Sequence, residues 1–113
     1  SAMNIHELND QELLTLVVLA KYMEHVDGEV SSSEMVDLVS LGEAVGMERF
    51  AAALDATKDQ YKDPHAVLHF VNSVTRYDAK VLIFILLEEL AKGDGVETPE
   101  EATLKELRMR WEI

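Results

Sequence analysis

Residues 27–34 have the sequence Asp-Gly-Glu-Val-Ser-Ser-Ser-Glu, which is the pattern D-G-x-x-S-x-x-E. Residues 94–101 repeat this pattern as D-G-x-x-T-x-x-E. Asp-Gly favours a turn, and a Ser or Thr followed three residues later by Glu is the capping box that opens a helix. Each copy also follows a long apolar segment and precedes a segment with helical spacing. Each therefore predicts a helix, an Asp-Gly turn and a second helix.

Apolar residues recur with helical spacing along almost the whole chain, and no strand or hairpin pattern interrupts them. The segments 13–23 and 81–90 are apolar nearly all round, which predicts two central helices wrapped by amphipathic ones. We therefore predict an all-α fold, a single compact bundle of six to seven helices that contains a pseudo-duplicated helix–turn–helix unit. Residues 1–3 are interpreted as a cloning remnant and the start Met, and residues 4–113 as one domain.

The two copies of the pattern align in two ways. An ungapped alignment, with the Asp-Gly pairs 67 residues apart, matches apolar positions before the turns, such as Leu16 with Ile83. After the turns, the apolar positions match better when one residue is deleted from the second copy. Capping logic then favours Glu101 as the counterpart of Glu34, whereas the hydrophobic phase favours Glu100. The sequence leaves both assignments open.

Composition limits the classes of ligand. The chain has 22 acidic and 10 basic residues and a formal net charge of −12. This charge disfavours nucleic acids and anionic lipid surfaces, and it favours cations or a basic partner protein. The absence of cysteine excludes disulfides, zinc thiolate sites and thiol nucleophiles. No apolar run approaches the roughly 20 residues that span a bilayer, so we expect a cytoplasmic protein without direct membrane insertion.

The acidic turns are candidate cation sites, because hard cations bind carboxylate, carbonyl and hydroxyl oxygens. The first copy matches the second half of an EF-hand calcium loop, but the first half of that loop is missing. We therefore expect at most weak calcium binding, with no other cofactor. The alternative interpretation is that these residues only cap helices and form turns. The candidate metal ligands are Asp27, Glu29, Glu34, Asp94 and Glu101.

The residues give little support for a transition-metal site or a catalytic site. His65 and His69 have the i, i+4 spacing of a metal-binding helix, but Ala66 stands where a metalloprotease has its glutamate. No Ser-His-Asp arrangement, phosphate loop or dinucleotide fingerprint is present. We expect no enzymatic activity.

The helix order and the two Asp-Gly turns resemble TerB-like domains, the all-helical tellurite-resistance proteins related to the N-terminal domain of DjlA co-chaperones. The resemblance covers about residues 8–111, and its specific part is the pair of turns. It implies a helical fold with internal pseudo-symmetry, a bacterial stress setting, no enzymatic activity and an acidic calcium-binding surface. By matching position, this calcium role falls on Asp27 and Glu34 first, and then on Asp94 and Glu101.

Two functions follow from these observations. The first is a TerB-like stress-response protein that binds calcium weakly at its acidic turns. The alternative is a metal-free helical module for protein–protein interaction. In either case the expected partner is a protein, basic or membrane-associated in character, and not a nucleic acid.

Overall fold

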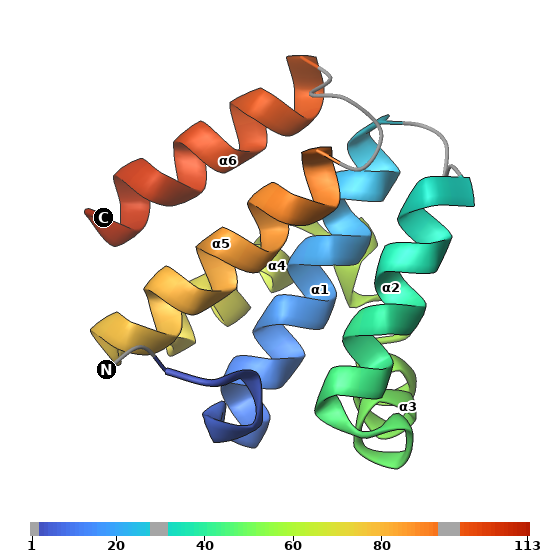
Figure 1. Ribbon diagram of the computed structural model, residues 1–113. Coiled ribbons are helices and arrows are strands. Elements are labelled where there is room, and N and C mark those ends of the chain that lie inside the picture. The colour runs from blue at the N-terminus through green and yellow to red at the C-terminus, as the bar shows by residue number, and fades with distance from the viewer. Residues whose placement is uncertain (1–2, 28–31, 93–97) are drawn as a thin grey trace.

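The computed structural model describes residues 3–27, 32–92 and 98–113. Within these ranges the chain forms six α-helices and two short 3-10 helices, and no β-strand (Figure 1). The elements are η1 (Ile5–Glu7), α1 (Asp10–Asp27), α2 (Ser32–Val45), α3 (Met47–Ala56), η2 (Gln60–Lys62), α4 (Pro64–Ser73), α5 (Tyr77–Lys92) and α6 (Thr98–Trp111). The predicted all-α bundle is confirmed.

Helix α1 is the centre of the molecule. It contacts α3, α4, α5 and α6, and it passes through the middle of the bundle with α4 behind it (Figure 1). Its apolar residues are buried on nearly every face, and the side chain of Leu16 is fully inaccessible. A helix that is apolar all round requires such a position, because exposing any of its faces would leave apolar area in water.

Helix α5 is buried along one stripe only. That stripe has the four-residue spacing of one helix face and consists of Ala79, Ile83, Leu87 and Ala91. Other apolar residues of α5, including Leu86 and Leu90, are half-buried, and Ile85 is 45% exposed. The prediction of a second central helix therefore holds for one face of α5, whereas its other apolar residues are only partly covered.

Helices α2 and α6 correspond closely. Each has 14 residues, and each buries an apolar residue at its tenth and fourteenth positions: Leu41 and Val45 in α2, Leu107 and Trp111 in α6. Glu34 and Glu100 are each the third residue of their helix. The helix starts thus agree with the alignment that deletes one residue, although the duplication itself stays a prediction.

A polar clamp joins the beginnings of α1 and α5. The buried carboxylate of Glu12 accepts hydrogen bonds from the Arg76 guanidinium, including Nε at 2.8 Å, and from the backbone N–H of Asn9 at 2.8 Å. The hydrogen bonds from Arg76 lower the pKa of Glu12, and they outweigh the opposing effect of burial. Arg76 also donates to the Glu7 carbonyl, so the same clamp holds η1 against α1.

Local signals set the remaining helix boundaries. Asp63 accepts a hydrogen bond from the His65 N–H at 3.0 Å and Pro64 opens α4, as the Asp-Pro pair predicts. Thr75 and Asp78 have the spacing that predicts a helix start capped by Thr75, but α5 begins at Tyr77, so Thr75 is not its cap. Gly46, with φ of 107°, separates α2 from α3.

Candidate functional site

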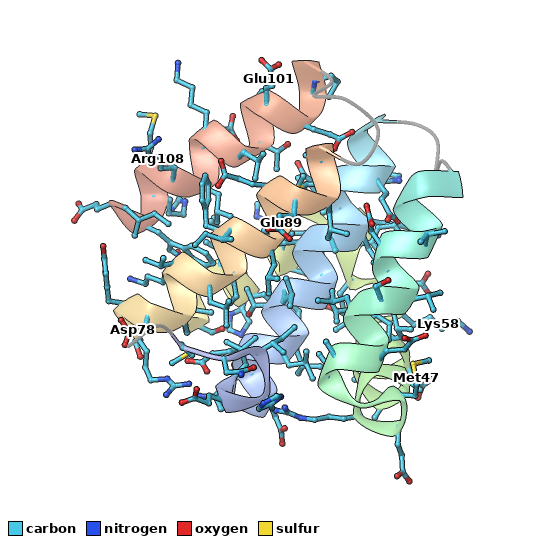
Figure 2. All side chains as sticks on the ribbon, viewed as in Figure 1. Met47, Lys58, Asp78, Glu89, Glu101 and Arg108 are labelled. Atoms are coloured by element: carbon cyan, nitrogen blue, oxygen red, sulfur yellow. The ribbon has the colours of Figure 1, made fainter. Side chains whose placement is uncertain are left out.

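Three of the five predicted cation ligands, Asp27, Glu34 and Glu101, belong to helix ends at one end of the molecule. Asp27 is the last residue of α1 and Glu34 is the third residue of α2, while Glu29 and Asp94 fall outside the described residues. The C-terminal ends of α1 and α5 and the N-terminal ends of α2 and α6 all point to this end, at the top of Figure 1. Glu101 is exposed and projects from the start of α6 (Figure 2).

Glu100, and not Glu101, faces the interior. Its side chain is 2% exposed and lines a small cavity of about 10 Å³ together with Glu24, between α1, α5 and α6. This volume is near the minimum that holds a single water. Two carboxylate side chains therefore border one enclosed space next to the helix ends, and sequence reasoning identified neither as a leading ligand. The apolar spacing of Leu104 and Leu107 defines the inward face of α6, and this spacing was the sequence signal that Glu100 would also face inward.

Among the described side chains, no group of three or more His, Asp or Glu residues is arranged to hold a metal ion. His65 and His69 are both exposed on α4, and His69 makes an edge contact with the ring of Phe70. The described residues therefore add no third ligand to this pair.

A groove lies between α2 and α5, and η1 contributes one residue to its lining. Its volume is about 520 Å³. Its apolar lining comes from Ile5 of η1, Leu41 and Ala44 of α2, and Leu86 and Leu90 of α5. We call this feature the α2–α5 groove. Sequence reasoning missed it because the apolar surplus of α5 was interpreted as core.

Three polar side chains also line the α2–α5 groove. Asp37 is half-buried on the α2 side, and Ser40 and Glu89 are exposed. Glu89 lies on the face of α5 that is turned to the viewer in Figure 2. The segments that line the two helical walls, residues 37–44 and 86–90, contain no Lys, Arg or His. The groove thus has a mostly aliphatic lining with one carboxylate on each helical wall, and we call Asp37 and Glu89 its acidic rim.

A small cationic cluster surrounds Tyr61 on the α1–η2 side. The Nζ atoms of Lys21 and Lys62 lie 5.1 and 5.7 Å from the centre of the Tyr61 ring, and His25 packs edge-on at 5.6 Å. Asp59 lies 3.5 Å from Lys62 and offsets part of this charge. Lys21 and Lys62 are 41 positions apart in the chain, so the sequence alone does not reveal this cluster. The fold brings the two lysines together.

Comparison with known proteins adds no relative. The chain matches no protein-family model, and neither the curated proteins nor the solved structures contain a significant match. The resemblance to TerB-like domains therefore stays a prediction. None of the helices in the described ranges is long and apolar enough to cross a membrane.

Proposed function

We propose that this protein is a non-enzymatic, TerB-like helical module that binds a partner protein through the α2–α5 groove. The observation that carries this proposal is the groove itself. It has a volume of about 520 Å³ and a mostly aliphatic lining, on an otherwise strongly acidic protein. A bacterial stress response and a cytoplasmic location accompany the TerB-like proposal.

The lining of the groove favours a protein ligand over a small molecule. Small-molecule sites combine apolar walls with a few buried polar groups that fix the orientation of the ligand. Here the lining residues Leu41, Leu86 and Leu90 are aliphatic, and the polar lining residues Ser40 and Glu89 are exposed. An apolar centre with a polar rim is the anatomy of a protein–protein interface. A groove of this kind between two helices suits an amphipathic helix, whose apolar face would lie between them.

The docking proposal is tested with a panel of amphipathic helical peptides that share one apolar stripe and differ in flanking charge. At least one member should give saturable backbone amide shifts at Leu41, Ala44, Leu86 and Leu90. Ala44→Phe should weaken that binding by at least about ten-fold, because it fills the groove from an exposed position.

Ala52→Phe is the matched control, since Ala52 is also an exposed helical alanine but lies on α3, outside the groove lining. It should leave the affinity unchanged. The docking proposal fails if no peptide of any flanking charge binds, or if Ala44→Phe and Ala52→Phe have equal effects.

Weak calcium binding at the acidic turns is the second candidate function. The observation that favours it is that Glu24 and Glu100 border one cavity at the end of the bundle where α1 ends and α6 begins. Glu24 is three residues before Asp27 in the chain, so one further carboxylate lies close in sequence to the first Asp-Gly turn. With an incomplete EF-hand loop, the expected dissociation constant is about 10⁻⁴ to 10⁻³ M.

Calcium titration followed by backbone amide shifts tests this second function. Saturable shifts centred on residues 24–34 should appear, and Asp27→Asn with Glu34→Gln should remove them. Non-saturating shifts spread over the acidic surface would reduce these residues to helix caps.

A further inference from the structure

We infer that the α2–α5 groove takes a basic amphipathic helix, with its apolar stripe between α2 and α5 and its Lys or Arg side chains beside Asp37 and Glu89. This inference rests on the proposed docking function and specifies the chemistry of the partner.

The apolar part of the partner follows from the walls of the groove. Leu41 is 8% exposed and forms part of the interior, whereas Leu86 and Leu90 are half-buried and present their remaining surface to the groove. The lining residues of α2 lie within residues 37–44, which is about two helical turns, and those of α5 lie within residues 86–90. A ligand helix with apolar residues at i, i+3, i+4 and i+7 would match this length of aliphatic lining.

The charge of the partner follows from the rim. Asp37 stands on the α2 side and Glu89 on the α5 side, so a bound helix would have a carboxylate on either flank. No basic side chain in the wall segments 37–44 and 86–90 neutralises them. Lys and Arg also suit such positions because their alkyl stems pack on apolar surface while the charge reaches the rim. The net charge of −12 adds long-range attraction for a cationic partner.

The same charges argue against other occupants. A second copy of this chain would bring an identical acidic rim against Asp37 and Glu89, and a two-fold symmetric contact would place like charges together. An anionic lipid or fatty acid would place its negative head group beside the same carboxylates. A basic helix from a different protein is the occupant that satisfies both the apolar interior and the acidic rim.

The experiment compares two peptides with the same apolar stripe, one flanked by Lys and one flanked by Gln, on the intact protein. The Lys peptide should bind about 4- to 25-fold more tightly at low salt, because each exposed charge pair contributes about two- to five-fold. Asp37→Asn with Glu89→Gln should remove most of this preference, so that the ratio of the two affinities approaches one. Raising the salt concentration should reduce the preference as well.

The control variant combines Glu48→Gln with Asp55→Asn, which removes the same formal charge from exposed positions on α3. It should retain the preference for the Lys peptide. Equal loss in both double variants would mean that general attraction to an acidic protein, and not the rim, selects the peptide, and this would overturn the inference.

Failure of the inference and failure of the docking proposal give different results. If the Gln peptide binds as tightly as the Lys peptide and Ala44→Phe blocks both, the groove is a docking site but not one for a basic partner. If neither peptide binds, the docking proposal fails with it. Self-association that Ala44→Phe abolishes, seen by sedimentation, would identify a second copy as the occupant and would also overturn the inference.

Discussion

Helices α1 and α5 are both apolar on nearly every face in sequence, and they differ in what covers them. Packing elements surround α1, which contacts α3, α4, α5, α6 and η2. Helix α5 contacts α1, α2 and α6, and its remaining face borders the α2–α5 groove. The matched positions Leu19 and Leu86 illustrate the difference, because Leu19 is buried and Leu86 is half-buried in the groove lining.

This difference shows that apolar residues with the same spacing serve two purposes in this chain. Those of α1 build the core, and their burial stabilises the fold. Those of α5 are in part only half-buried against the core, and Leu86 and Leu90 among them also line the α2–α5 groove. Exposed apolar area of this kind opposes solubility unless a partner covers it or a charged rim surrounds it. In this protein the rim is acidic, which connects the packing of α5 to the proposed choice of partner.

The sharpest test of this comparison makes the same substitution at the matched positions. Leu19→Ala should lower the free energy of unfolding by about 2–5 kcal/mol, because it removes buried methyl groups and leaves a cavity. Leu86→Ala should cost about 1 kcal/mol or less, since its neighbours already border open space. Denaturant unfolding of both variants measures the difference. Equal costs would show that α5 is as deeply packed as α1 and that the groove is closed in solution.

Glu12 and Ala79 occupy matched, buried positions near the starts of α1 and α5, but only Glu12 is charged. Glu12→Gln should cost about 1.5–3 kcal/mol at neutral pH, because it weakens charge-assisted hydrogen bonds from Arg76. The pKa of folded Glu12 is lowered from its ordinary value of 4.5, so the unfolded chain takes up the proton first as the pH falls. This contribution to stability is therefore complete above pH 4.5 and is lost below it.

Unfolding free energies measured from neutral pH downward test this sign. The difference between the native protein and Glu12→Gln should be constant at neutral pH and should shrink as the pH falls below the ordinary value of a glutamate. A difference that stays constant into acid would mean that the Arg76 clamp is not what stabilises the carboxylate.

The eleventh residues of α2 and α6 give a smaller contrast. Gly42 is buried, and an added Cβ would lie 2.7 Å from Cδ2 of Phe50 on α3. Gly42→Ala should cost about 1–3 kcal/mol from this overpacking, partly offset by the higher helix propensity of Ala. The counterpart Arg108 is exposed, so Arg108→Ala should change stability by less than about 0.5 kcal/mol. Thermal unfolding of both variants measures these costs. A Gly42→Ala variant that is more stable than the native protein would show that α2 and α3 do not approach this closely.

Local signals in the sequence predicted much of the fold. Helical spacing identified the six α-helices, and Asp63 with Pro64 correctly marked the start of α4. The burial of Leu107 in α6 agrees with its helical spacing, because a single amphipathic stripe has only one way to face a core. Thr75 was a wrong cap for α5, since helix starts shift by a residue without a change in spacing.

Burial of the central helices and the location of the groove were not predictable in this way. Periodicity states that a helix has apolar faces, but it does not state which other helix covers each face. Val39 fits the stripe of α2 in sequence and is 48% exposed, while Leu41 is buried instead. The groove depends on the separation of α2 from α5, two elements that are more than 30 residues apart in the chain. The cluster around Tyr61 escaped detection for the same reason.

The smallest expected effect concerns the two acidic turns. If calcium binds with a dissociation constant of about 10⁻⁴ to 10⁻³ M, 1 mM free calcium should raise the free energy of unfolding by about 0.4–1.4 kcal/mol. Magnesium should give less, because it holds its waters and requires stricter octahedral geometry. Asp27→Asn with Glu34→Gln should abolish the calcium effect if the first turn holds the ion.

The second turn separates the two assignments of its glutamate. Glu101 is exposed and Glu100 is buried in the same helical position as Glu34, so Glu101→Gln should leave the calcium effect intact. Glu100→Gln should reduce the effect if the buried carboxylate contributes. Thermal unfolding at constant ionic strength, with sodium chloride in place of calcium as the control, measures these changes. An equal rise with sodium chloride would assign the effect to general screening of the −12 charge and would leave both turns as helix caps.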